Sequence, residues 1–188
     1  MNTPSHYILN LAILGTTISP KEKVAITIGA ILPDIPIFIL YFVAKFVYKL
    51  PEAQIWSETY YEPFWQNLVA FFHSFPLALI GLSVCLYCGW KPGAIACASI
   101  ILHSVFDFPF HHDDAHRHFF PFSDYRFISP LSYWDKKHYG QFVAFGELLL
   151  VLCLTPLVFK LNPSMLTKGL VIAINLLYVF GYVRFYLL

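Results

Sequence analysis

The chain has 188 residues, of which 58% are hydrophobic, 19% aromatic and only 12% charged, and its mean hydropathy is +0.63. This composition lies far from that of soluble domains and predicts an integral membrane protein whose first partner is the lipid bilayer. A net charge of +1 provides neither a basic field for nucleic acid nor an acidic tail for a cationic partner, so neither partner is indicated.

The first part of the chain predicts a short helix and then a broken one. Asn2 to Ser5 is typical of a helix start before the apolar run 7–18. Twelve residues rise about 18 Å, less than the roughly 30 Å of a hydrocarbon core, so this helix enters the bilayer without crossing it alone. The run 24–46 is long enough to cross, but Pro33, Asp34 and Pro36 interrupt it near its middle. A carboxylate at that depth is costly unless it is paired or bound to a metal.

The rest of the chain predicts an interfacial loop and further spans. Residues 47–65 are rich in tyrosine, tryptophan and glutamate, a mixture typical of the membrane surface. We expect spans at 66–90, 94–110, 141–159 and 169–186, separated by short turns and by one long loop. The predicted fold is therefore all-α: a polytopic membrane helix bundle of about five to six helices. It forms a single domain over 1–188, with a His/Asp-rich loop at about 111–140 on one face.

Polar residues from distant parts of the chain converge on that face. If the short turns 19–23, 91–93 and 160–168 share one face, both long loops share the other, and five residues approach it: His6, Asp34, His73, His103 and Asp107. His103 and Asp107 are four residues apart, so on a helix they lie on one side and can hold the same ion. Imidazole nitrogens and carboxylate oxygens suit zinc at a hydrolytic centre.

The number of donors is sufficient for two ions. His6, Asp34 and His73 add to the His103 and Asp107 pair, and an aspartate is a natural bridge between two metals. The run of His111, His112, Asp113 and Asp114 is available to complete the metal shell. A pair of metals would hold both the attacking and the leaving oxygen of a phosphoester.

Two arginines of the long loop are candidates for substrate binding. Arg117 and Arg126 follow the histidine run. A guanidinium group offers a bidentate fork to phosphate, so we expect these side chains to clamp an anionic group of the substrate.

The same residues resemble a known family. His6, the Leu-Pro-Asp34 segment, His73-Ser74 and the His103-Ser-Val-Phe-Asp107 pair follow one another as in the membrane-bound metal-dependent hydrolases described as LexA-regulated inner-membrane hydrolases. Those in turn are similar to zinc-dependent phospholipase C and P1 nuclease. The resemblance covers residues 1–135, and its most specific part is the HxxxD pair.

The resemblance implies roles for individual residues. His6, Asp34, His73, His103 and Asp107 take metal-ligand roles, and His111 or His112 takes that of the histidine after the HxxxD pair. Asp34, His103 and Asp107 are the expected catalytic residues. Soluble relatives carry a later HxxxE pair for a further metal. This chain instead has His138 and Glu147 nine positions apart, which cannot form that helical pair.

Single residues also have simpler explanations. His73 could hydrogen-bond a neighbouring helix instead of a metal, and Asp34 could cap a broken half-helix. We expect His116 and His118 to lie in a solvated part of the loop. We also expect Glu147, which is charged within an apolar segment, to pair with Lys136, Lys137 or His138.

The expected function is a membrane-embedded, zinc-type hydrolase acting on a phosphoester or lipid-like substrate at the membrane surface. We expect it in the inner or plasma membrane. The lysines of the short turns favour a site outside the cytoplasm: Lys21, Lys23, Lys91, Lys160 and Lys168. Two alternatives stay open, namely a non-catalytic metal-binding or transport protein and a membrane scaffold with structural His/Asp pairs.

Overall fold

A computed structural model describes residues 1–16, 18–19, 22–162 and 164–188. These residues form helices and connecting segments without any strand, as the composition predicts. The α-helices are α1 (Thr3–Leu14), α2 (Lys23–Ile31), α3 (Ile35–Phe42), α4 (Glu52–Ser57), α5 (Pro63–Phe72), α6 (Phe75–Tyr87), α7 (Lys91–Asp107), α8 (Gly140–Leu161) and α9 (Met165–Tyr182). The shorter 3-10 and π turns are η1 (Leu32–Asp34), η2 (Val43–Val47), η3 (Thr59–Tyr61), η4 (Lys136–His138) and η5 (Val183–Leu187).

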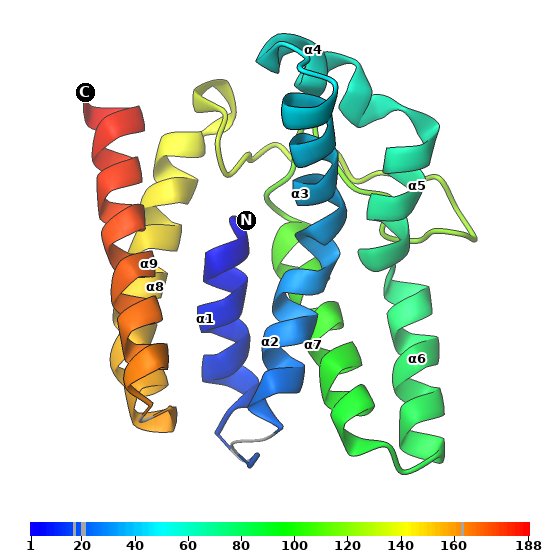
Figure 1. The fold of residues 1–188 in the computed structure, drawn as a ribbon, viewed down its shortest axis with the longest axis vertical. Coiled ribbons are helices and arrows are strands. Elements are labelled where there is room, and N and C mark those ends of the chain that lie inside the picture. The colour runs from blue at the N-terminus through cyan, green and yellow to red at the C-terminus, as the bar shows by residue number, and fades with distance from the viewer. Residues whose placement is uncertain (17, 20–21, 163) are drawn as a thin grey trace.

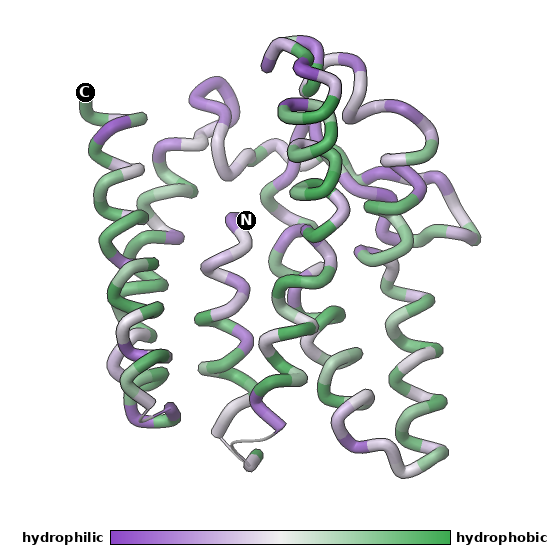
Figure 2. Tube along the Cα trace, viewed as in Figure 1, coloured by the Kyte–Doolittle hydropathy of each residue, from purple (hydrophilic) through white to green (hydrophobic). Residues whose placement is uncertain are grey.

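The helices stand side by side as a bundle (Figure 1). Helix α1 lies in the middle, between the α8/α9 pair and the α2/α7 pair, and α6 packs against α7 at the far edge. The long segment between α7 and α8 crosses the end of the bundle at which α4 also lies. Hydrophilic residues gather in the connecting segments at the ends, whereas α6, α8 and α9 are largely apolar (Figure 2).

Three helical segments are long and apolar enough to cross a membrane: Lys23–Val47, Gly140–Leu161 and Met165–Leu187. The bent pair of α5 and α6 adds a fourth if it counts as one span. The described residues thus contain three or four such spans, fewer than the five that the sequence predicts, because α7 has only 17 residues. This composition and these lengths are consistent with a membrane protein.

The interruption predicted in the second hydrophobic run is present. Pro33 and Asp34 lie in the 3-10 turn η1, which joins α2 to α3 without ending the apolar segment. Pro36 follows at the start of α3. A proline removes one backbone donor and crowds the preceding turn, so the chain tightens here and carries Asp34 inward.

The uninterrupted span expected at 66–90 is wrong. The chain bends by 43° between α5 and α6. His73 ends α5, and the Ser74 hydroxyl caps α6 by accepting from the Leu77 amide at 3.1 Å. Pro76 prevents a continuous helix because its ring lacks an N–H and clashes with the preceding turn. His73 therefore lies at a break, where its ring leaves the helix end.

Other expectations need smaller corrections. The interfacial loop predicted at 47–65 contains α4 and η3. Asn2 precedes α1 as expected but makes no side-chain cap hydrogen bond. The turn expected at 19–23 includes Pro20 and Lys21, which lie outside the described residues.

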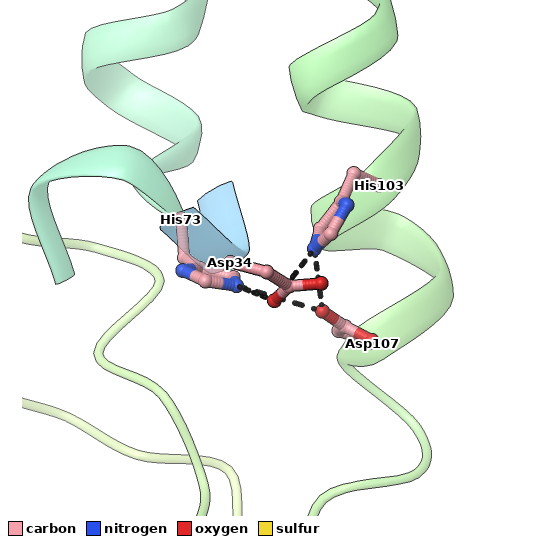
Figure 3. A group of neighbouring side chains, drawn as sticks. All are labelled: Asp34, His73, His103 and Asp107. Carbon is pink, nitrogen blue, oxygen red and sulfur yellow. Dashed lines mark ion pairs between the residues drawn. The ribbon is translucent and has the colours of Figure 1, made fainter. Parts of the chain in front are cut away.

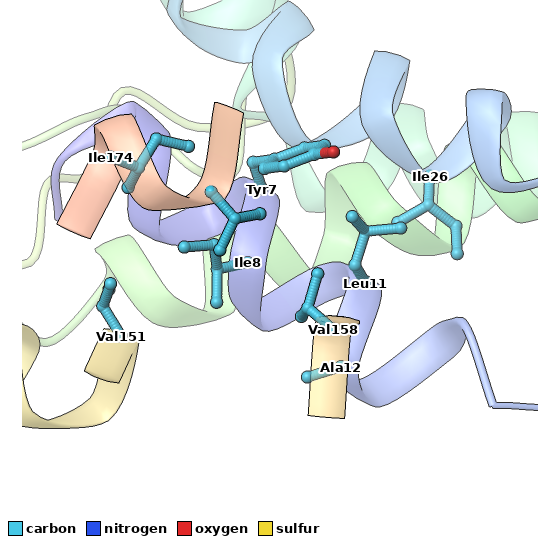
Figure 4. Packing of buried hydrophobic residues seen from close by; sticks show 9 residues of the cluster. Tyr7, Ile8, Leu11, Ala12, Ile26, Val151, Val158 and Ile174 are labelled. Atoms are coloured by element: carbon cyan, nitrogen blue, oxygen red, sulfur yellow. The ribbon is translucent and has the colours of Figure 1, made fainter. Parts of the chain in front are cut away.

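Helix α1 is an interior helix, although it is too short to cross alone. Its apolar residues pack with those of α2, α8 and α9 in one buried cluster (Figure 4): Tyr7, Ile8, Leu11, Ala12, Ile26, Val151, Val158, Val171 and Ile174. Because its neighbours cover it on several sides, every residue from Ser5 to Ala12 is buried. This burial places His6 inside the bundle.

Small residues bring α2 close to α7. A Cβ on Gly29 would clash with the Ala96 carbonyl and would lie 2.6 Å from Ser99 Cβ. The Ser99 hydroxyl donates to the Ile26 carbonyl at 2.7 Å. Asn10 of α1 donates to the Ser99 carbonyl at 2.9 Å. Such close packing, with polar bonds between helices, fixes the η1 turn against the C-terminal half of α7.

Candidate metal centre

Four buried side chains from three parts of the chain meet inside the bundle (Figure 3). Asp34 comes from η1, His73 from the end of α5, and His103 and Asp107 from α7. Each offers one nitrogen or oxygen atom such that all these atoms lie within 4.8 Å of one another. We call these four residues group A.

Backbone carbonyls orient both imidazoles of group A. His73 Nδ1 lies 2.9 Å from the Val69 carbonyl, and His103 Nδ1 lies 2.9 Å from the Ala30 carbonyl. An Nδ1–H that donates to a carbonyl leaves the Nε2 lone pair free. Both Nε2 atoms are buried and have no hydrogen-bond partner among the described residues. Both Nε2 atoms therefore face the carboxylates, which is the orientation that metal binding by these rings requires.

The spacing of group A fits a tetrahedral ion. His73 Nε2 lies 3.7 Å from Asp34 Oδ1 and 3.6 Å from Asp107 Oδ2. His103 Nε2 lies 3.6 Å from Asp34 Oδ1 and 2.9 Å from Asp107 Oδ2. Ligand atoms about 2.1 Å from a tetrahedral zinc lie roughly 3.4 Å apart. The donor set and its spacing therefore fit a metal ion.

A second group shares Asp107. It consists of Asp107, His111 and His116, all buried, and we call it group B. Asp107 Oδ1 lies 3.2 Å from His111 Nε2, whereas Oδ2 is the oxygen near the group A imidazoles. His116 Nε2 is again buried without a hydrogen-bond partner among the described residues. The two oxygens of one carboxylate thus face two neighbouring groups, which is the geometry of a bridge.

His6 lies beside both groups. Its Nε2 is 2.9 Å from Asp107 Oδ1, and its ring stacks on His103 with 3.7 Å between the centroids. The Met1 amino group also contacts Asp107 and lies 3.1 Å from His111 Nε2. Helix α1 therefore brings His6 to the centre, as the sequence predicts.

The histidines expected in a solvated loop are instead buried. His116 and His118 are each only 3% exposed, which contradicts that expectation. The His118 ring stacks on Phe75 with 5.2 Å between the centroids, and its carbonyl accepts from the Phe75 amide at 2.8 Å. Burial and the nearby His73 lower the pKa of His116 well below its usual value and lower the pKa of His118 to about 3. Both rings are thus neutral at neutral pH, the form that binds metals.

His112 points away from the centre. Its Nδ1 lies 2.6 Å from the Ser129 carbonyl, and its ring stacks on His138 with 3.5 Å between the centroids. It belongs to neither group. Of the two adjacent histidines that the sequence offers for one role, the structure brings only His111 to Asp107.

The two arginines hold the loop. Arg117 donates to Asp124 at 2.7 Å and to the Asn67 side chain at 2.5 Å. Arg126 donates to the Ala115 carbonyl at 2.5 Å and to the Gln66 side chain at 2.9 Å. Neither guanidinium lines the cavity described next. The structure therefore places Arg117 and Arg126 away from the expected phosphate-binding position.

A cavity of about 500 Å³ leads to both groups. Asp34, His111 and His116 form part of its wall. Aromatic and acidic residues form most of the remainder: Phe38, Trp56, Tyr60, Tyr61, Asp113, Asp114, Tyr133 and Trp134. We call it the metal cavity. Its size suits a small organic ligand or a lipid head group.

Glu147 does not pair with a cation, contrary to expectation. Its carboxylate accepts from the Asn2 amide at 2.8 Å, the Asn2 side chain at 3.0 Å, the Ser5 hydroxyl at 2.6 Å and the Tyr178 hydroxyl at 2.9 Å. Within the described residues, no ion pair joins it to Lys136, Lys137 or His138, and His138 lies 2.7 Å from Asp135 instead. Glu147 therefore fixes the start of α1 beside the candidate centre.

His116→Ala is expected to reduce the metal content of purified protein by about half, because group B loses a buried, unpartnered nitrogen. His112→Ala is the matched control, since it removes a neighbouring imidazole outside both groups. Mass-spectrometric metal analysis measures both variants. Equal metal content in the two variants would contradict the assignment of His116 to group B.

His116 is not among the metal ligands predicted from the sequence, whereas Asp114 belongs to the 111–114 run that is predicted to complete the metal shell. Asp114 Oδ2 lies 3.0 Å from His111 Nδ1 and so orients the His111 ring from the side opposite Asp107. Both Asp114 and His116 lie beyond the end of α7, so only the path of the loop brings them in. Comparisons with protein-family models, with curated proteins and with solved structures found no match.

Proposed function

We propose that this protein is a membrane-embedded, metal-dependent hydrolase that cleaves a phosphoester of a lipid-like substrate. One observation carries the proposal. Buried Nε2 atoms of His73, His103 and His116 meet the carboxylates of Asp34 and Asp107 at the wall of a ligand-sized cavity. Of these three atoms, only His103 Nε2 lies at hydrogen-bond distance from a carboxylate, 2.9 Å from Asp107, so a scaffold of structural His/Asp pairs leaves the Nε2 atoms of His73 and His116 unexplained.

Zinc is the proposed metal. Two buried carboxylates so close together are costly unless positive charge offsets them; the Met1 amino group pairs with Asp107, and a metal ion in group A would offset Asp34 as well. Imidazole nitrogens with carboxylate oxygens form the donor set of zinc at hydrolytic centres, whereas magnesium and calcium prefer oxygen alone. When bound, zinc lowers the pKa of a coordinated water toward about 7 and polarises phosphoryl oxygens.

The protein residues position the reaction. One carboxylate oxygen of Asp107 faces group A and the other faces group B, so this residue fixes the position of one group relative to the other. The Asp34 carboxylate accepts from the Thr3 hydroxyl at 2.5 Å, which leaves its other oxygen toward His73 and His103. Deep burial keeps bulk water away from groups A and B on the side of the bundle interior. The metal cavity admits the substrate from the opposite side.

The resemblance to LexA-regulated inner-membrane hydrolases supports the same activity, and we propose membership of that family and a place in the inner or plasma membrane. We also propose that the centre faces away from the cytoplasm. A transporter needs a polar path to the opposite face. Below the centre, Ile8 and Leu11 of α1 instead pack with Ile26 of α2 in the apolar cluster. This apolar packing favours an enzyme over a carrier.

Removal of metal tests the proposal. Detergent-purified protein would be assayed with bis(4-nitrophenyl) phosphate and with mixed phospholipid micelles, before and after chelation and again after zinc is added. We expect hydrolysis to fall by at least about 100-fold on chelation and to return with zinc. Hydrolysis that persists unchanged in protein shown to contain no metal would overturn the proposal, as would its absence in zinc-loaded protein across both substrate classes.

A further inference from the structure

A second cavity, of about 470 Å³, lies between the start of α1 and the helices α8 and α9. Glu147 and Tyr178 line one part of it, and Tyr133, Trp134 and Lys136 line another. It is separate from groups A and B, since none of their residues lines it. We call it the α8/α9 cavity.

The Glu147 carboxylate and the Tyr178 and Tyr186 hydroxyls of this cavity are already engaged in hydrogen bonds. Both Glu147 oxygens accept hydrogen bonds from α1, and one of them also accepts from the Tyr178 hydroxyl. The Tyr186 hydroxyl donates to the Trp134 carbonyl at 2.9 Å. A ligand would therefore meet aromatic faces and alkyl groups, with few free hydrogen-bonding partners. Such a lining favours a hydrocarbon chain.

One cation lies on the lining. Lys136 is exposed, and its amine lies 5.5 Å from the centroid of the Tyr186 ring. An amine held over an aromatic ring at the edge of an apolar cavity complements the phosphate-bearing head group of a phospholipid. Because Glu147 is fully engaged, the cavity has no comparable partner for a cationic ligand.

The α8/α9 cavity adjoins the metal cavity. Asn2, Tyr133 and Trp134 line both. Helices α8 and α9 belong to segments apolar enough to cross a membrane, so the cavity has hydrocarbon-compatible helices on one side and the metal cavity on the other. One lipid could place a chain in the first and its head group in the second.

We propose that the α8/α9 cavity binds one hydrocarbon chain of a phospholipid whose phosphoester lies in the metal cavity. This inference rests on the proposed hydrolase function and specifies its substrate as a chain-bearing phospholipid. Trp134 and Tyr133, which line both cavities, form the wall over which the molecule bends, and Lys136 lies on the lining of the α8/α9 cavity.

Two substitutions fill the cavity from opposite walls. A Cβ on Gly181 of α9 meets no heavy atom within 4 Å, so Gly181→Leu adds volume without a clash. Ala144→Leu adds volume from α8, because Ala144 also lines the cavity. The matched control is Gly169→Leu, which is also open around its Cβ, lies on α9 as well and does not line the cavity.

Photo-crosslinking locates the chain. The protein would be reconstituted in phosphatidylglycerol vesicles containing a phosphatidylglycerol with a diazirine at its chain end, irradiated, digested and mapped by mass spectrometry. Surrounding lipid labels the outer faces of α8 and α9 in every variant. Labels at Pro4 or at Tyr133 and Trp134 report a chain inside the cavity.

We expect these inner labels in wild type and in Gly169→Leu, and at least a five-fold loss in Gly181→Leu and Ala144→Leu. Labels confined to the outer faces of α8 and α9 in all four proteins would overturn the inference. So would inner labels that persist in both cavity-filling variants.

Hydrolysis and metal content separate this inference from the proposed function. Gly181→Leu should keep its zinc and its rate on bis(4-nitrophenyl) phosphate, and lose at least about ten-fold on long-chain phospholipid. Asp107→Ala should lose hydrolysis of both substrates but keep the inner labels. If wild type hydrolyses nothing yet shows inner labels that Gly181→Leu loses, the proposed function fails while the chain-binding site stands.

Discussion

Asp107→Ala is expected to remove metal from both groups at once. Asp107 is shared by groups A and B, and its two oxygens face different imidazoles. Loss of a residue that supports a ligand already costs 10 to 100-fold in metal affinity or activity, so loss of the bridge should cost at least about 100-fold in hydrolysis. Metal analysis and phosphoesterase assays measure the two effects on the same preparation.

Asp113→Ala is the control for this variant. Asp113 lines the same metal cavity but is exposed and belongs to neither group, so its loss should leave the metal content unchanged. His116→Ala provides a second comparison, because it removes a donor from group B alone. If Asp107→Ala kept the full metal content of wild type, Asp107 could not be the bridge.

Glu147→Ala should lower both the stability of the fold and the metal content of the candidate centre. The substitution leaves donors of Asn2, Ser5 and Tyr178 without their buried acceptor, which we expect to lower the free energy of unfolding by about 2–4 kcal/mol. Because these bonds fix the start of α1, His6 loses its position beside Asp107. Thermal unfolding in detergent, followed by intrinsic fluorescence, measures stability, and metal analysis measures the centre.

The conservative and control variants make the result specific. Glu147→Gln keeps an oxygen acceptor and should recover most of the metal content. Glu52→Ala removes an exposed carboxylate paired with Lys45 at 2.7 Å, and should change the free energy of unfolding by less than about 1 kcal/mol. Equal unfolding temperatures for Glu147→Ala and Glu52→Ala would show that Glu147 does not anchor α1.

Local sequence patterns predict much of the candidate centre. Helical spacing alone places His103 and Asp107 on one side of α7, and Pro33 with Pro36 marks the break that carries Asp34 inward. The sequence predicts that the short first helix, which carries His6, enters the bilayer without crossing it alone; the packing of neighbouring helices then buries His6. These features depend on neighbours a few residues apart, which is why the sequence reveals them.

Other features depend on contacts between distant segments. The bend at His73 is stabilised from the loop, where the Phe120 carbonyl accepts from the Ser74 hydroxyl and the His118 carbonyl accepts from the Phe75 amide. The same contacts bury His118, although a run of histidines and aspartates is typical of solvent. Glu147 finds its donors on α1 and α9, not among the nearby lysines.

The metal content of wild-type protein is the most direct test of the central claim, that groups A and B form a metal centre. Protein purified in detergent from zinc-containing medium, without an affinity tag that binds metals, would be analysed by mass spectrometry for zinc and competing divalent ions. We predict one to two tightly held ions per chain, with zinc in excess. Protein that is folded and yet retains no stoichiometric metal would contradict the claim.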